Sequence, residues 1–131
     1  MSLQFFLAVI AYVVPLFPLA YLWHLSTFKT SYDRLEIFRD NPVIPLGLAS
    51  MVLQGVFFAW VFPKLFGGPS WIANGLEFAV IFAVLGWSFM VLPVAAKYRM
   101  TSVGKFMILE TAFVVLQFVV TGLLIAWVYR I

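Results

Sequence analysis

The sequence predicts an all-α integral membrane protein, a four-helix bundle formed by a single domain over residues 1–131. Two observations support this class. The chain is 65% hydrophobic, and only 10% of its residues are charged, against about 25% in an average soluble domain. Its apolar residues also gather into runs long enough to cross the hydrocarbon core as helices, which takes about 20 residues each. A soluble domain of this composition would lack enough polar groups to cover its surface.

Four apolar segments are the expected spans, at about residues 3–25, 44–62, 75–96 and 106–129. Open β-strands cannot replace them, because unpaired backbone groups are too costly in lipid. Short connections make successive spans antiparallel neighbours. Pro15 and Pro18 predict a kink or break in the first span, since proline lacks a backbone donor. Asn74 followed by Glu77 resembles a capping box at the start of the third span.

The distribution of Lys and Arg predicts the orientation of the spans. The loops at residues 26–43 and 97–105 carry six of these residues, whereas the opposite side carries only Lys64 and Arg130. Cytoplasmic loops of membrane proteins are enriched in Lys and Arg. We therefore expect both loops in the cytoplasm and both termini outside.

The stretch "FKTSYDRLEIFRDNP", residues 28–42, predicts a short amphipathic helix in the membrane interface between the first two spans. Its apolar residues recur at helical spacing. Two ion pairs are expected along it, Lys29 with Asp33 and Glu36 with Arg39, and Asp33 with Glu36 could form an N-terminal box. Its charges balance, three positive and three negative, which suits ion pairs or a protein partner. The predicted docking surface comprises Phe28, Tyr32, Asp33, Arg34, Leu35, Glu36, Phe38 and Arg39.

Glu110 is the acidic residue expected inside the membrane, roughly 6 Å from the end of the fourth span at 1.5 Å per residue. Neither Lys nor Arg lies three or four positions from it. Its partner must therefore come from another span or from a loop. The candidates at similar depth are Ser50, Tyr21 and Ser88, with Arg34 or Arg39 reaching in from the loop. Glu110 is either a proton-exchanging or ligand-binding carboxylate, or a structural contact.

Further polar residues predict that the second and fourth spans meet. Gln117 and Thr121 continue the face of Glu110, and Ser50 shares a face with Gln54 in the second span. Gln54 and Gln117 then lie near each other at mid-membrane, where such residues either join helices or line a pore. Small residues spaced by four favour close helix packing, within the chain or between copies: Gly55 and Ala59, Ala79 and Ala83, Gly122 and Ala126.

Several kinds of site are disfavoured. The chain has no Cys and a single histidine, His24, so it offers neither a thiolate site nor a pair of histidine ligands. We predict no metal site and no catalytic residue, and the absence of a basic run disfavours nucleic acid. No cofactor is predicted, although fifteen Phe residues would suit a bound lipid, quinone or pigment.

Four stretches, "LWHLSTFKTSYDRL", "NPVIPLGLASMVLQGVFFAWVFPKLF", "FAVLGWSFMVLPVAAKYRM" and "ETAFVVLQFVVTGLL", together resemble small four-span bacterial membrane proteins classed as domains of unknown function. This resemblance implies the four-span topology and a bacterial inner membrane. It carries no activity, so it assigns no catalytic residue.

The leading functional hypothesis is a non-enzymatic accessory or structural subunit of a larger membrane complex, or a homo-oligomer. Its partners would be membrane lipids and other membrane subunits or a second copy of the chain. One alternative is a small transporter or channel that uses Glu110 and the polar faces of the second and fourth spans. A second alternative is a lipid-modifying enzyme that uses Glu110 with His24.

Overall fold

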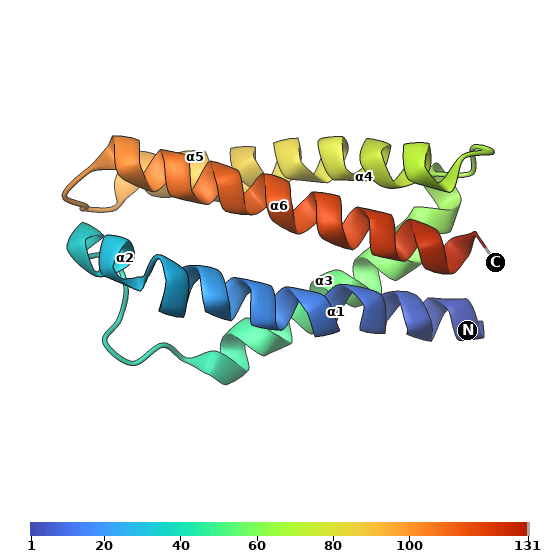
Figure 1. The fold of residues 1–131 in the computed structure, drawn as a ribbon, viewed down its shortest axis with the longest axis horizontal. Helices are drawn as coiled ribbons and strands as arrows, with labels where there is room; N and C mark the ends of the chain where they lie inside the picture. The colour runs from blue at the N-terminus through green and yellow to red at the C-terminus, as the bar shows by residue number, and fades with distance from the viewer. Residues whose placement is uncertain (131) are drawn as a thin grey trace.

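The computed structural model describes residues 1–130, and helices make up most of this part of the chain (Figure 1). Four helical segments are long and apolar enough to cross a membrane: Leu3–Thr27, Ile44–Leu65, Trp71–Lys97 and Val103–Tyr129. The predicted all-α four-span class is confirmed. The third span begins earlier than predicted, at Trp71.

The elements in chain order are α1 (Leu3–Leu22), the π-helical turn η1 (Trp23–Thr27), α2 (Lys29–Leu35), α3 (Ile44–Leu65), α4 (Trp71–Gly86), the π-helical turn η2 (Trp87–Val91), α5 (Leu92–Lys97) and α6 (Val103–Tyr129). α6 packs along α4 on one side and along α1 on the other, and α3 packs against α1. α3 crosses α1 and diverges from it toward its own N-terminal end (Figure 1).

Glycines allow the helices of the bundle to approach closely. A Cβ atom on Gly122 of α6 would lie 2.6 Å from the carbonyl oxygen of Gly75 in α4. In α3, a Cβ atom on Gly55 would lie 3.2 Å from the Val13 side chain of α1. Small residues favour helix association in lipid because backbones can then pack against each other. At these positions the small residues serve packing within the chain.

An aromatic cluster fills the centre of the bundle. Phe58 of α3 lies 5.1 Å from Phe78 of α4 and 5.9 Å from Phe118 of α6, measured between ring centroids. Each such pair contributes about 0.5–1.5 kcal/mol beyond its buried area. The cluster therefore joins three spans.

The start of α4 differs from the predicted capping box. Ser70 is the N-cap, and its side-chain oxygen accepts a hydrogen bond from the backbone N–H of Ala73. Asn74 instead binds Gly68, donating to its carbonyl and accepting from its N–H. Glu77 is therefore not at the N3 position. Ser70 caps the helix in place of Asn74, because the helix starts at Trp71, one turn before the start that hydropathy predicted.

The first span is not broken at its prolines, because α1 continues through Pro15 and Pro18. Membrane helices tolerate proline where neighbouring groups satisfy the freed carbonyls. The irregular turns lie elsewhere. η2 ends two residues before Pro93, whose missing N–H and bulky ring disfavour regular α-helix in the preceding turn.

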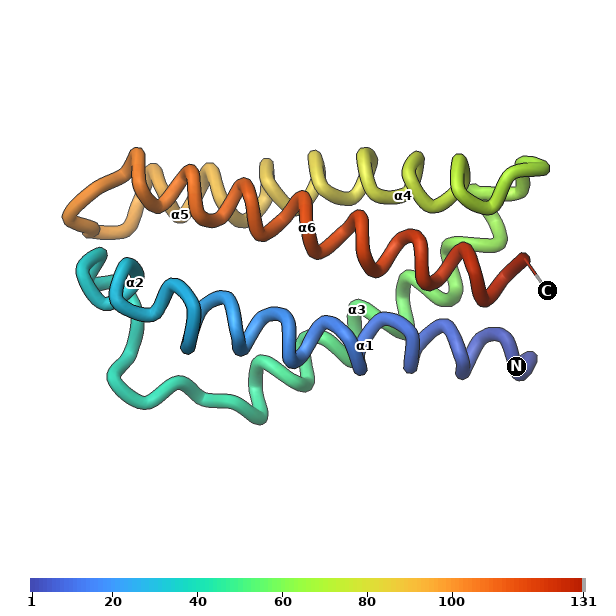
Figure 2. Tube along the Cα trace, in the orientation of Figure 1, coloured from blue at the N-terminus to red at the C-terminus, as the bar shows by residue number. Residues whose placement is uncertain are grey.

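The amphipathic helix between the first two spans is present but shorter than predicted. α2 ends at Leu35 because Glu36 takes a left-handed conformation with φ 60°. The linker then runs to the start of α3 without helix (Figure 2). Lys29 pairs with Asp33 at 2.6 Å, as predicted. Glu36 and Arg39 do not share a helical turn, and Asp33 lies in the last turn of α2, so the second pair and the N-terminal box were wrong.

α2 folds back onto the bundle with its apolar face inward. Tyr32 and Leu35 are buried. The Leu35 carbonyl accepts a hydrogen bond from the Thr101 N–H at 3.3 Å, and the Arg34 carbonyl accepts one from the Thr101 hydroxyl at 2.5 Å. Tyr32 and Leu35, two members of the predicted docking surface, therefore pack inside the protein and are not accessible to a partner. The exposed members of this surface are Asp33, Arg34, Glu36, Phe38 and Arg39, while Phe28 is half-buried.

Candidate functional site

The turn η1 presents His24 at the end of the first span. Its π-type geometry is defined by the backbone N–H of Phe28, which donates to the Trp23 carbonyl at 3.1 Å, five residues earlier. Such turns change the direction of the side chains that follow a regular helix, and they are frequent at functional sites. His24 thereby leaves the α1 surface and turns toward α6.

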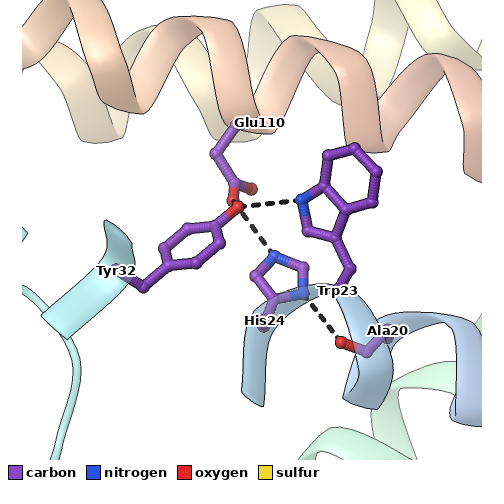
Figure 3. Close-up of polar contacts among 5 residues, drawn as sticks. All are labelled: Ala20, Trp23, His24, Tyr32 and Glu110. Carbon is purple, nitrogen blue, oxygen red and sulfur yellow. Dashed lines mark hydrogen bonds and ion pairs between the residues drawn. The ribbon is translucent and has the colours of Figure 1, made fainter. Parts of the chain in front are cut away.

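Both ring nitrogens of His24 are engaged (Figure 3). Nδ1 lies 3.0 Å from the Ala20 carbonyl oxygen and Nε2 lies 3.0 Å from Oε1 of Glu110. A carbonyl can only accept a hydrogen bond, so Nδ1 carries a proton. The second contact then holds one shared proton, either as imidazolium with carboxylate or as neutral imidazole with carboxylic acid. The pair has a net charge of zero in both forms.

Tyr32 is the second partner of Glu110 and comes from α2. Its hydroxyl donates to Oε1 of Glu110 at 2.5 Å and accepts from the indole N–H of Trp23 at 3.2 Å (Figure 3). Burial raises the pKa of Tyr32, and the hydrogen bond and charge of Glu110 raise it further. Tyr32 therefore stays neutral and donates its proton. Contacts from two segments thus converge on one carboxylate oxygen of Glu110.

This charged cluster, formed by Trp23, His24, Tyr32 and Glu110, is mostly withdrawn from solvent. The side chains of His24 and Glu110 are 18% and 17% exposed, and the Phe113 ring lies 4.5 Å from the His24 ring. Apolar residues would fill the same space at lower cost in desolvation. An ionisable pair at the end of a span is for this reason a candidate functional site.

An open groove of about 590 Å³ lies beside the charged cluster and shares His24 with it. It runs between α1, the linker at residues 37–43 and the first half of α3. Most of its lining is apolar, and Tyr21, His24, Arg39 and Ser50 add polar groups. The groove exists because α3 diverges from α1 over residues 44–50, all of which are exposed.

A second polar network lies deeper in the bundle and joins three spans. The Tyr12 hydroxyl of α1 donates to Gln54 of α3 at 2.6 Å and accepts from the Gln117 amide of α6 at 3.0 Å. Gln54 also donates to Ser50 at 2.9 Å, and the fully buried Thr121 donates to the Gln117 carbonyl at 2.8 Å. The two glutamines are thus connected through Tyr12 rather than directly.

The partners of Glu110 differ from the candidates predicted from depth. Ser50 bonds to Gln54 instead, and Ser88 donates to the Leu85 carbonyl of its own helix at 3.0 Å. Tyr21 and Arg39 line the groove, while Arg34 is exposed on α2. His24, which the lipid-modifying alternative paired with Glu110, is the partner from the first span, and Tyr32 is the partner from α2.

Tyr12 and Tyr32 are site residues that the sequence interpretation did not place in these roles. Tyr12 lies four residues after Ala8 and four before Leu16, and all three are buried. This helical spacing is the sequence feature that could have predicted a buried position for Tyr12. Within residues 1–130 the structure shows no group of three His, Asp or Glu side chains that could hold a metal ion.

Comparisons with protein-family models, with curated proteins and with solved structures found no match to this chain. The resemblance to small four-span bacterial proteins stays a prediction.

Proposed function

We propose that this protein is a non-enzymatic membrane protein that binds one amphiphilic molecule in the groove. The observation that carries the proposal is the groove itself. Its volume of about 590 Å³ falls within the roughly 300–1,000 Å³ typical of ligand sites, which are mostly apolar with a few polar groups. An apolar molecule with a polar head matches this lining.

Access to the groove favours a ligand that comes from the bilayer. Leu46 of α3 is 70% exposed, and the groove is open along one side rather than enclosed. An amphiphile can enter laterally, with its apolar part remaining out of water. Tyr21, His24 and Arg39 lie toward the loop end of the bundle, where a polar head would meet the aqueous phase.

The contacts of the charged cluster favour binding over catalysis. Both nitrogens of His24 are engaged within the protein, and Glu110 does not line the groove. Neither is directed at a molecule in the groove as a general acid or base must be. This arrangement argues against the lipid-modifying hypothesis. An accessory role in a larger complex would be compatible with binding, and it stays a prediction.

The transporter alternative receives less support from the deeper network. Tyr12 is fully buried, and its hydroxyl is satisfied by Gln54 and Gln117. Interhelical bonds of this kind contribute about 0.6–2 kcal/mol each to helix association. The network therefore fits helix packing better than the lining of a conducting path.

Native mass spectrometry of protein purified in mild detergent tests the proposed function. We expect one amphiphile retained per chain, and a large loss of retention in Gly47→Leu. Gly47 lines the groove and a Cβ atom there meets nothing within 4 Å, so the leucine occupies the groove without disturbing the fold.

Gly104→Leu is the matched control, because a Cβ atom on Gly104 also meets nothing within 4 Å and Gly104 lies in the first turn of α6, outside the groove. The control should retain the amphiphile as the parent protein does. Equal retention by both variants, or no retained amphiphile in the parent protein, would contradict the proposal.

A further inference from the structure

We infer that the molecule in the groove is an anionic phospholipid, with its phosphate bound by Arg39 and Tyr21 and an acyl chain lying along the apolar wall. This inference rests on the proposed function and specifies the class of ligand.

Arg39 is a cation on the groove that the protein itself does not neutralise. It lines the groove and is exposed. Within residues 1–130 the ion pairs are His24 with Glu110 and Lys29 with Asp33, so even the adjacent Asp40 does not pair with Arg39. A guanidinium offers several N–H donors in a planar fork that matches a phosphate. A ligand with an acidic head would supply the missing partner.

Tyr21 adds a second donor on the α1 side of the groove. Its side chain is 49% exposed, and the described part of the chain provides no hydrogen-bond partner for its hydroxyl. The Ser50 hydroxyl oxygen accepts from Gln54, and within the described residues its own O–H has no acceptor. Within the described residues the groove thus presents uncommitted donors on Arg39, Tyr21 and Ser50, and a phosphate has oxygens enough to accept from several donors.

The remaining electrostatics of the groove do not oppose an anion. The His24–Glu110 pair carries no net charge in either position of its shared proton, so it leaves the charge of Arg39 uncompensated. The acidic residues of the stretch 28–42 are matched in number by its basic ones. Lys97 at the end of α5, Arg99 in the loop after it and Lys105 in the first turn of α6 add further positive charge. A basic residue attracts an anionic lipid by about 1 kcal/mol when the lipid lies near it. Arg39 is the one Lys or Arg in the groove lining, so it is the residue expected to set the preference.

The shape and lining of the groove favour a membrane phospholipid over a small soluble anion. A small ion without an acyl chain would make no use of the apolar wall. This wall includes residues from both helices: Phe17, Leu25, Ile44, Leu48 and Met51. Because the groove is open along one side, it can cover one acyl chain while the rest of the lipid stays in the bilayer.

Lipid retention after delipidation tests the inference. The purified protein is mixed with phosphatidylglycerol or phosphatidylcholine of identical acyl chains, and native mass spectrometry measures the bound fraction of each. We expect phosphatidylglycerol to be retained about fivefold more than phosphatidylcholine, the ratio that one charged contact of this strength provides. In Arg39→Gln the two lipids should be retained equally.

Arg34→Gln is the matched control, because Arg34 is exposed on α2 and lies outside the groove lining. It should keep the preference for phosphatidylglycerol. Equal retention of the two lipids by the parent protein would overturn the inference, as would the same loss in Arg34→Gln and Arg39→Gln. Stronger retention of oleate than of phosphatidylglycerol would overturn the assignment of a phospholipid.

The Gly47→Leu variant separates this inference from the proposed function. If the parent protein binds both lipids equally and Gly47→Leu releases both, the groove binds an amphiphile but does not select its head. If Gly47→Leu releases neither lipid, both the inference and the proposed function fail.

Discussion

Glu110 receives its hydrogen bonds from two segments that are distant in sequence, the end of the first span and α2. His24 and Tyr32 both bind Oε1, so the carboxylate ties the amphipathic helix to the bundle. The position of Glu110 near the end of its span was predictable from hydropathy. Its contact with His24 was part of the lipid-modifying hypothesis alone, because no sequence signal marked the π-type turn η1 that presents His24. Its hydrogen bond with Tyr32 was not predicted.

Tyr32→Phe should lower the free energy of unfolding by about 1–3 kcal/mol, the range for losing a bond to a charged group. Thermal unfolding in detergent measures the change. The matched control is Tyr98→Phe, since Tyr98 is 60% exposed, and it should change stability by less than about 0.5 kcal/mol. Equal stability of the two variants would show that the Tyr32 hydroxyl contributes nothing.

The contribution of Tyr32 should also depend on pH. Its folded-state pKa is raised by burial and by Glu110, whereas an unfolded tyrosine titrates near pH 10. A raised pKa means that the stabilisation is complete below about pH 10 and is lost as the pH rises from there toward the folded-state pKa. The difference in stability between the parent protein and Tyr32→Phe should therefore narrow above about pH 10.

At the scale of elements, α6 holds the bundle together by packing on both α4 and α1. The four spans were predictable because each needs only a long apolar run. Element ends were less predictable. Ser70 and Asn74 are both suitable caps, and the structure starts the helix after Ser70. α2 ended early because Glu36 adopts a left-handed conformation, which residue spacing does not reveal.

Gly122→Ala should destabilise the α4–α6 contact by about 1–3 kcal/mol, the usual cost of overpacking. The added Cβ atom would lie 2.6 Å from the Gly75 carbonyl oxygen and 2.9 Å from the Phe78 ring. A backbone oxygen cannot move aside as a flexible side chain can, so the helices must separate. The measurement is again thermal unfolding in detergent.

Gly104→Ala serves as the control, since its Cβ atom would meet open space. It should unfold at or above the temperature of the parent protein. If Gly122→Ala were as stable as Gly104→Ala, the close approach of α4 and α6 would not be a packing constraint.

The whole molecule places α2 and the loop before α6 at one end, and the start of α1 and the end of α6 at the other (Figure 1). The first arrangement is fixed by the bonds of Thr101 to residues 34 and 35. The sequence predicted this antiparallel arrangement from short connections. Which end faces the cytoplasm stays a prediction from the distribution of Lys and Arg.

The groove is a property of the whole molecule that the sequence could not reveal. It depends on the angle at which α3 leaves α1, and this angle follows from the close contact at Gly55 and from the linker at residues 37–43. Arg39 was predicted as part of a docking surface for a protein partner. The structure places it on the groove wall, where our proposal gives it a lipid ligand instead.

Photocrosslinking tests the central claim, that the groove binds an amphiphile, most directly. Phosphatidylglycerol with a photoreactive acyl chain is reconstituted with the protein, and the labelled peptides are identified by mass spectrometry. We predict labelling concentrated on residues 17–25 and 44–51, the two walls of the groove. Labelling spread in proportion to exposure, with the outward face of α6 around Ile108 and Val115 modified as strongly as the groove, would contradict the account.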